Sequence, residues 1–426
     1  MARVRGRLRK GVAIVAAFGA LGLPLAAGAV WGAMREAEQG EPAAVTVTIG
    51  VPRLPGSVSP RPEDVPSLGP DVQRRLDAAV QGIMRVAHVP GVTVGLWTPG
   101  KGSYVRSFGV ADRSSHRPMT PDLLMRIGSE TKTFTVTALL RLVDRGKAGL
   151  DDPVSKYVDG VPGGSRITLR QLAGMRSGLF NYSEDPAFLK ALTSDPHHSF
   201  TPRDLLGYAF KHRPLFPPGR QFDYSNTNLI LLGLVVEKAG GQPLGEFIQK
   251  NVIHPARLGH TSFPTEAAFP GPHAEGYTEQ TASGKAGTAT DWNPSWAWAA
   301  GAMISDLGDL RSWARTVATG ILPDGTALVS PALQQQRLIG SPTSVAGAGY
   351  GLGIFEVQGW IGHNGSLPGY ESLAVFLPPA RTTLVVLLNS DVRKDGQEPS
   401  SLLGEAITRI VTPDHVFSLP EQPAAG

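Results

Sequence analysis

The chain has 426 residues, 41% of them hydrophobic and 18% charged, which provides enough length for two or three domains and ample material for a core. It contains no cysteine, which excludes disulfides, thiolate nucleophiles, iron–sulfur clusters and a lipidated cysteine. Five of its 40 Lys and Arg residues lie within the first ten positions. The rest of the chain is close to neutral against 36 Asp and Glu, so nucleic acid is not expected as a partner.

Residues 1–39 are predicted to be a signal peptide or a membrane anchor. The basic segment Met1–Lys10 precedes an uncharged, mostly apolar run, Gly11–Ala33. Basic residues stay in the cytoplasm, so the sequence that follows is expected to be exported. The small residues Ala27-Gly28-Ala29 have the pattern of a cleavage site, although the run is also long enough for a retained anchor. We expect a protein that is secreted or anchored at the outer face of the cytoplasmic membrane, with membrane contact only through this segment.

Three further regions follow: a proline-rich linker at 40–70, a folded body at 71–413 and a short tail at 414–426. Apolar spacing and turn residues predict the elements of the body. In chain order they are a helix at 71–87, strands at 91–97 and 104–110, a buried helix at 129–145, helical pieces from about 150 to 290, strands at 352–357, 360–363, 372–376 and 382–388, and a helix at 401–411. The predicted class is α/β: a mainly antiparallel sheet built from both chain ends, flanked by terminal helices, with an inserted all-helical subdomain.

The first motif that carries chemistry is Ser129-Glu130-Thr131-Lys132. Residues three apart share a helix face, so the Lys132 amine can lie beside the Ser129 hydroxyl. A serine needs a base to become a nucleophile, and burial in an apolar helix can lower the pKa of a lysine enough for it to serve. The helix N-terminus also favours a developing oxyanion. Alone, the motif is equally compatible with a capping serine and a solvated lysine.

The second motif is Tyr224-Ser225-Asn226, in a loop before a predicted helix. A tyrosine near cations can be a phenolate or can relay protons between nucleophile and leaving group. The Asn226 amide can hold a substrate carbonyl and orient the lysine. An isolated tripeptide of this kind is more often a half-buried tyrosine with a capping asparagine.

The third motif, His363-Asn364-Gly365-Ser366, follows a predicted edge strand. Gly365 would let a substrate backbone approach closely, and the Ser366 N–H is placed to donate to an oxyanion. His363 offers a cation or a proton relay near neutral pH. A single histidine on a strand is usually structural, so this motif indicates a catalytic site only in combination with the other two.

In this order, the three motifs make the chain resemble the serine β-lactamase and penicillin-binding family, in the branch of D-alanyl-D-alanine carboxypeptidases, class C β-lactamases and related esterases. That family has Ser-x-x-Lys, then Tyr-x-Asn, then His/Lys-Thr-Gly on a strand. Other stretches are similar to the family as well: Ile167-Thr-Leu-Arg-Gln-Leu-Ala-Gly-Met-Arg-Ser-Gly-Leu179, Phe216-Pro-Pro-Gly219, Ala300-Gly-Ala-Met-Ile-Ser305 and Gly369-Tyr370.

The resemblance implies roles for the residues of the motifs. Ser129 would be the acylated nucleophile, Lys132 its activator and Tyr224 a proton relay, with His363 as an electrostatic partner. Whether Lys132 or Tyr224 is the base is left open. The resemblance implies substrate contacts for the remaining motif residues, which are Asn226, Asn364, Gly365 and Ser366.

Two departures from the family pattern bear on the substrate. Asn364 stands where threonine is usual, and no Lys or Arg occurs between Arg337 and Arg381. A fixed cation offsets the cost of dehydrating a carboxylate, so its absence predicts that neutral esters and amides compete with free acids as substrates.

The sequence therefore predicts an exported serine hydrolase that forms an acyl-enzyme, of the DD-carboxypeptidase or β-lactamase kind. The alternatives are an esterase or D-amino-acid amidase of the same fold, and an inactive relative that binds peptidoglycan or senses β-lactams. The expected partner is a small-molecule or peptide substrate, such as a peptidoglycan stem peptide or a β-lactam. No cofactor or metal is expected, since the ten histidines include no His-Glu-x-x-His. The absence of Gly-x-Ser-x-Gly argues against an α/β-hydrolase.

Overall fold

A ten-stranded sheet runs through the computed structural model, which describes residues 47–48, 66–343 and 347–418. Every neighbouring pair is antiparallel, in the order β1-β9-β10-β11-β12-β13-β14-β2-β3-β4. The strands are β1 Val47–Thr48, β2 Gly91–Thr98, β3 Gly102–Asp112, β4 Arg117–Pro118, β9 Ile339–Pro342, β10 Ala348–Tyr350, β11 Phe355–Val357, β12 Trp360–Leu367, β13 Tyr370–Leu377 and β14 Thr382–Leu388. Two small ribbons pair β5 Met125–Arg126 with β8 Ile304–Ser305, and β6 Tyr277–Thr278 with β7 Gly287–Thr288.

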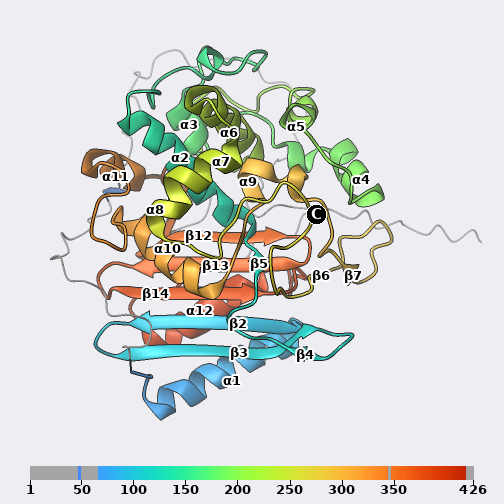
Figure 1. Cartoon of the computed structure of the whole chain (residues 1–426), viewed down its shortest axis with the longest axis vertical. Coiled ribbons are helices and arrows are strands. Elements are labelled where there is room, and N and C mark those ends of the chain that lie inside the picture. Colours follow the sequence, from blue (N-terminus) through green and yellow to red (C-terminus); the bar gives the residue numbers. More distant parts are fainter. Residues whose placement is uncertain (1–46, 49–65, 344–346, 419–426) are drawn as a thin grey trace, which may run out of the picture.

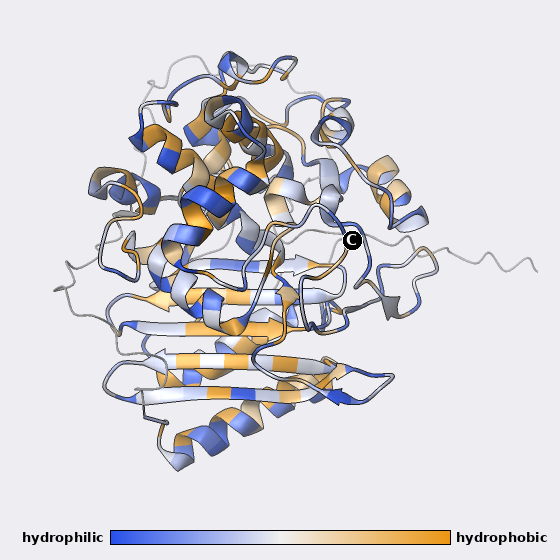
Figure 2. Ribbon diagram, viewed as in Figure 1, coloured by the Kyte–Doolittle hydropathy of each residue, from blue (hydrophilic) through white to orange (hydrophobic). Residues whose placement is uncertain are grey.

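Helices cover both faces of this sheet, which is why its central strands β2, β13 and β14 are buried along their whole length. Helix α10 (Leu307–Thr319) packs on one face (Figure 1). Helix α12 (Pro399–Val411) packs on the other, and α1 (Pro70–Val86) packs against α12. Figure 2 shows the same division by hydropathy, with hydrophobic residues along β13 and β14 and hydrophilic residues along the outer side of α1.

The remaining helices form a subdomain above the sheet in Figure 1, with α2 and α6 packed against each other at its centre. Most residues of α2 and α6 are buried, and α6 ends where Gly241 takes a left-handed conformation with φ +71°. The bounds are α2 Thr131–Asp144, α3 Leu169–Ala173, α4 Pro186–Ser194, α5 Pro202–Ala209, α6 Asn226–Gly240, α7 Leu244–Ile248, α8 His254–Ala256, α9 Trp298–Gly301 and α11 Pro331–Leu338. The predicted fold class is confirmed: the sheet joins both chain ends and the helical subdomain is inserted between them.

Strand β12 differs from its prediction in length and position. It continues through the Asn364-Gly365 pair to Leu367, because β13 pairs with it along its whole length. It is also an inner strand, flanked by β11 and β13. Strand β11, however, pairs only with Trp360–Gly362. Among the described strands, none pairs with the other side of 363–367, and this half of β12 is the part that reaches the site.

The described residues include only part of the two terminal regions of the chain. The predicted signal peptide or anchor at 1–39 lies outside them, as does most of the predicted linker. No helix within the described ranges combines the length and apolarity needed to cross a bilayer. Beyond Pro413, where the body was predicted to end, Phe417 is buried, with its ring 6.0 Å from Phe355 and its N–H donating to Thr408 Oγ1. The packed body therefore continues to Phe417.

Candidate active site

Ser129 lies on a single 3₁₀ turn, Gly128–Glu130, which leads directly into α2. Gly128 has a φ of +51°, which favours glycine. A Cβ at this position would lie 2.8 Å from the Ser366 backbone nitrogen. The glycine therefore allows the turn that carries Ser129 to approach strand β12 closely.

Lys132 is completely buried in the first turn of α2. Its Nζ lies 2.8 Å from Ser129 Oγ and 2.8 Å from the Ala300 carbonyl oxygen, to which it donates. Burial lowers the pKa of Lys132 well below its usual value, which favours the neutral amine that can accept a proton. The lysine was predicted to be oriented by Asn226; the structure shows the Ala300 carbonyl in that role.

Tyr224 lies on the other side of this amine, with Lys132 Nζ 4.9 Å from the centre of its ring. Burial raises the pKa of Tyr224 above its usual value, and a hydrogen bond with Ser129 opposes that rise. The phenol is therefore neutral near pH 7. Of the two possibilities raised by the sequence, this arrangement suits a proton relay and disfavours a phenolate.

His363 is also completely buried, and its neighbours define its tautomer. Nδ1 is 2.6 Å from the Asn364 carbonyl oxygen, so it donates there, and Nε2 is 3.1 Å from the Tyr350 hydroxyl, from which it accepts. Burial, reinforced by Lys132, lowers the pKa of His363 to about 3. A cation at His363, one of the two options predicted, is therefore disfavoured near neutral pH. Tyr350 lies on β10, outside the three motifs, so the sequence did not point to it.

The opposite face of β12 meets buried carboxylates. Asn364 Nδ2 donates to Glu398 Oε2 at 2.9 Å, the Ser366 hydroxyl also hydrogen-bonds Glu398, and Arg393 pairs with the second Glu398 oxygen at 3.0 Å. Asn364 is not among the residues that line the cavity beside Ser129. A substrate contact of Asn364 stays a prediction, and the structure gives its amide a supporting contact behind the strand.

The close backbone approach predicted at Gly365 is present, but its partner is the chain itself. A Cβ here would lie 2.0 Å from the Ile127 carbonyl oxygen and 2.7 Å from Ser372 Oγ. Only glycine fits, because the segment that leads into Ser129 packs directly on the strand. Gly365 thus positions the nucleophile's loop, and it does not line the cavity.

A cleft opens beside Ser129, and two of the residues predicted to bind substrate, Asn226 and Ser366, are among its walls. Asn226 Nδ2 donates to Ser183 Oγ at 3.0 Å, whereas its Oδ1 is buried with no partner among the described residues. The unpartnered Oδ1 can accept from a substrate N–H, and the second N–H of Nδ2 can donate to a substrate carbonyl, so the carbonyl contact expected from the sequence stays a prediction. The aromatic walls come from three separate short helices, which carry Tyr182, Phe188 and Trp296.

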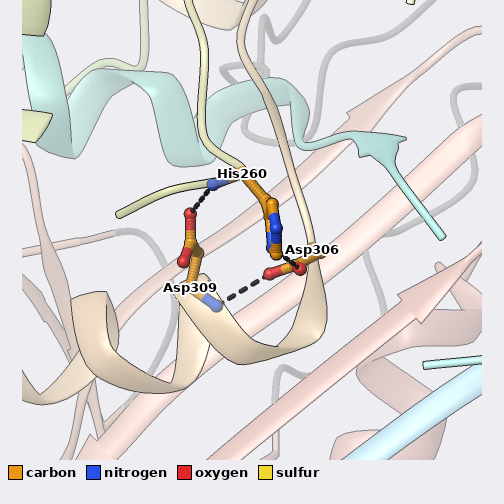
Figure 3. Close-up of side chains that lie close together, drawn as sticks. All are labelled: His260, Asp306 and Asp309. Atoms are coloured by element: carbon orange, nitrogen blue, oxygen red, sulfur yellow. Dashed lines mark hydrogen bonds and ion pairs between the residues drawn. The ribbon is translucent and has the colours of Figure 1, made fainter. Parts of the chain in front are cut away.

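One group of potential metal ligands occurs among the described residues, at His260, Asp306 and Asp309 (Figure 3). Asp306 caps α10 by accepting from the Asp309 N–H, and its other oxygen lies 2.6 Å from His260 Nδ1. The His260 N–H and the Thr261 hydroxyl donate to Asp309. These hydrogen bonds account for the grouping as the link between the loop at 260 and the start of α10.

The fold and this arrangement of Ser129, Lys132 and Tyr224 define a class: the serine hydrolases of the β-lactamase and penicillin-binding type. The family model Beta-lactamase matches residues 76–406, and the chain belongs to that family.

Known proteins that the chain resembles include enzymes acting on amides. It is 32% identical to a D-stereospecific amidohydrolase from Streptomyces sp., with a TM-score of 0.69, over 79% of this chain and 98% of the other. It is 25% identical to D-amino acid amidase from Ochrobactrum anthropi SV3, solved with D-phenylalanine, with a TM-score of 0.67 and the same coverage. Among curated proteins, it is 27% identical to protein flp of Staphylococcus aureus over 75% of this chain, and the match spans 63% of that relative's length.

Proposed function

We propose that this protein is a serine amidohydrolase that cleaves amides or esters of acyl groups with a bulky apolar side chain, in the manner of the D-stereospecific amidases it resembles. The observation that carries the proposal is the 2.8 Å hydrogen bond between the buried Lys132 amine, whose pKa is lowered by burial, and Ser129 Oγ. This pair lies beside a cavity with aromatic walls. The chemistry requires a base at the serine, and the cavity accounts for the acyl preference.

In the proposed reaction, Ser129 Oγ attacks the substrate carbonyl carbon while its proton passes to Lys132 Nζ. The neutral phenol of Tyr224 is a poor proton acceptor, so the lysine takes the role of base. The backbone N–H groups of Ser129 and Ser366 stabilise the oxyanion. Tyr224 then donates a proton to the leaving amine or alcohol and recovers one from Lys132. Water hydrolyses the acyl-enzyme by the reverse series of transfers.

Two features support an amide over a D-alanyl-D-alanine acid as the substrate. Neutral His363 provides no charge for a carboxylate on the leaving group. The solved amidases also match this chain over 98% of their own lengths.

The test combines labelling with a substrate panel. A fluorophosphonate should label the wild-type protein at Ser129, identified by mass spectrometry, and Ser129→Ala should lose both labelling and turnover. The panel compares D-phenylalanine amide, L-phenylalanine amide and a peptide ending in D-Ala-D-Ala. Substantial labelling of Ser129→Ala at another serine, or no labelling of the wild type, would contradict the proposal.

A second candidate is a penicillin-binding DD-carboxypeptidase. The observation in its favour is a relative described as the putative penicillin-binding protein PbpX of Bacillus subtilis, 26% identical over 67% of this chain and 66% of that protein. Covalent labelling by a fluorescent penicillin, together with faster release of D-Ala from the peptide than of ammonia from D-phenylalanine amide, would favour it.

We also propose that the protein is exported. The support is the sequence of residues 1–33, in which basic residues precede an apolar run. Fractionation of cells that express the full chain, followed by N-terminal sequencing of the exported protein, tests export and cleavage together.

A further inference from the structure

Arg126 is a buried cation three residues before the nucleophile, on the short strand β5. Its side chain is 2% exposed, and its guanidinium lies 4.8 Å from the centre of the Phe269 ring. One nitrogen, Nη2, donates to the carbonyl oxygens of Ala267 at 2.6 Å and Thr290 at 3.2 Å. These contacts use only part of a group that has five N–H donors.

The other two guanidinium nitrogens of Arg126, Nε and Nη1, are buried and have no hydrogen-bond partner among the described residues. None of the ion pairs between described residues includes Arg126. Asp291 favours its charge electrostatically but is largely exposed and forms no ion pair with it. A buried charge without a paired anion is costly, so an anion that reached Arg126 would be held firmly.

Arg126 lines a small cavity that adjoins the one beside Ser129. The two cavities have five wall residues in common: Trp296, Ala297, Gly301, Leu367 and Pro368. Besides Arg126, the wall of the small cavity also includes Ala289, Trp292 and Pro294. The cavity lined by Arg126 is therefore a neighbour of the one beside Ser129, with Trp296 in both walls.

The positions of the proton-transfer groups indicate which part of a substrate would extend in this direction. Tyr224 must protonate the leaving group, and the rings of Tyr224 and His363 are 6.2 Å apart, centre to centre. The leaving group therefore faces the His363 end of β12. The small cavity that Arg126 lines is also lined by Leu367 and Pro368, which lie at the other end of β12 from His363. The acyl part of the substrate therefore points toward Arg126.

We propose that Arg126 forms an anion subsite that binds a carboxylate carried on the acyl part of the substrate. The proposal rests on the proposed function in that Ser129 fixes the position of the scissile bond. The carboxylate accepts charge-assisted hydrogen bonds from the free guanidinium nitrogens, and the aromatic walls exclude water from the pair. The enzyme then selects an acyl group that is apolar near the scissile carbonyl and anionic at its far end.

Two substrate pairs test the subsite. N-succinyl-D-phenylalanine p-nitroanilide is compared with its terminal carboxamide analogue, which removes the acyl-side charge. N-acetyl-D-phenylalanyl-D-alanine is compared with its C-terminal amide, which removes a leaving-group charge. Both pairs are measured on wild type, Arg126→Gln, Arg126→Lys and the control Arg141→Gln. Arg141 is a half-buried arginine of α2 that also donates to a carbonyl, of Leu328, but lines neither cavity.

Wild type should prefer the succinyl acid by at least about tenfold in kcat/KM, or ~1.4 kcal/mol. Arg126→Gln should reduce the preference to about twofold or less, Arg126→Lys should retain part of it, and Arg141→Gln all of it. The leaving-group pair should show little preference in any variant. A preference that is absent in wild type, survives in Arg126→Gln, or occurs only in the leaving-group pair would overturn the subsite.

Calorimetry of the same compounds on Ser129→Ala separates this proposal from the proposed function. If the wild type neither labels nor turns over, the proposed function fails, but tighter binding of the succinyl acid that is lost in Ser129→Ala/Arg126→Gln still supports the subsite. If the wild type turns over its substrates but the preference for the succinyl acid does not depend on Arg126, the subsite fails and the proposed function stands. Should the Gln variants fail to fold, the wild-type and Arg126→Lys ratios decide.

Discussion

The two ends of the cleft beside Ser129 are built differently. At one end, Lys132, Tyr224, His363 and Tyr350 are buried, contact one another and have pKa values shifted toward their neutral forms. At the other end, aromatic residues line the two cavities, and Arg126 is a cation there. Two of its guanidinium nitrogens have no hydrogen-bond partner among the described residues.

This difference separates proton transfer from recognition. Proton transfer requires groups whose charges have been suppressed and whose positions are fixed by packing. Recognition requires space and unsatisfied polar atoms that only a ligand completes. Each of the following predictions would sharpen or break that division.

The largest effect is expected at the polar end, from Lys132. Lys132→Arg should lower kcat/KM about as much as Lys132→Ala, by roughly 10³-fold or more, because a guanidinium stays protonated and cannot accept a proton. In wild type, activity should fall on the acid side as the lysine becomes protonated. Steady-state kinetics across pH measures both effects. An Arg variant with more than about a tenth of wild-type activity would contradict base or relay chemistry at Lys132.

A smaller effect is expected from Tyr350, which fixes the tautomer of His363. Tyr350→Phe removes the donor to Nε2 and should lower kcat by roughly 10- to 100-fold with KM little changed, since the acyl pocket is untouched. The matched control is Tyr104→Phe, which removes the hydroxyl of another buried tyrosine, bonded to Asp77. If kcat were unaffected, or if both variants lost activity equally, the hydroxyl would have no specific role at the site.

The aromatic end should show the converse pattern. Trp296→Ala should raise KM about tenfold for a D-phenylalanine substrate and much less for a D-alanine substrate, with kcat nearly constant, because only bulky acyl groups reach this wall. Trp298→Ala is the control, since Trp298 packs on Gly233 and lines neither cavity. Equal losses for both substrates would place Trp296 in the chemistry.

The smallest effect is expected from Glu371, a buried carboxylic acid on β13 next to strand β12. Burial, and then neighbouring Glu398, raise the pKa of Glu371 well above its ordinary value of 4.5. Between the unfolded pKa of about 4.5 and the higher folded pKa, the folded state keeps a proton that the unfolded chain has lost. The free energy of unfolding therefore falls as pH rises across this range. Glu371→Gln should remove this loss and raise the free energy of unfolding by about 1 kcal/mol at pH 8, with no gain at pH 4.

Urea unfolding at both pH values checks this prediction. Glu405→Gln, which removes a partly exposed carboxylate paired with Arg409, is the control and should not change the pH slope in this way. A Glu371→Gln variant that is less stable than wild type at pH 8 would mean that Glu371 is ionised and paired in the folded protein.

The sequence was sufficient for most of the architecture because apolar periodicity marks buried elements directly. Helix α1 and strand β14 agree with their predictions to within a residue. Strand β12 was predicted four residues too short, since Asn364-Gly365 has the composition of a turn, and only pairing with β13 keeps it extended.

The site was predictable where local spacing sets the geometry, as it does for Ser129 and Lys132. It was not predictable where burial changes a group's charge. His363 can be a cation in water, whereas in the fold burial, and then Lys132, lower its pKa. Arg126 was adjacent to the first motif, yet no pattern indicates that its partners are carbonyls and not a carboxylate.

The pairing of β14 with β2 has a consequence for folding during synthesis. These two neighbours in the sheet are separated by almost the whole folded body, so β2 and β3 emerge from the ribosome long before β12, β13 and β14. Contacts of such high sequence separation form slowly. Until the last strands arrive, the β2–β3 hairpin exposes an apolar edge that invites aggregation. Ser129 also remains apart from Ser366 until then, so the nascent chain cannot hydrolyse any substrate before its sheet is complete.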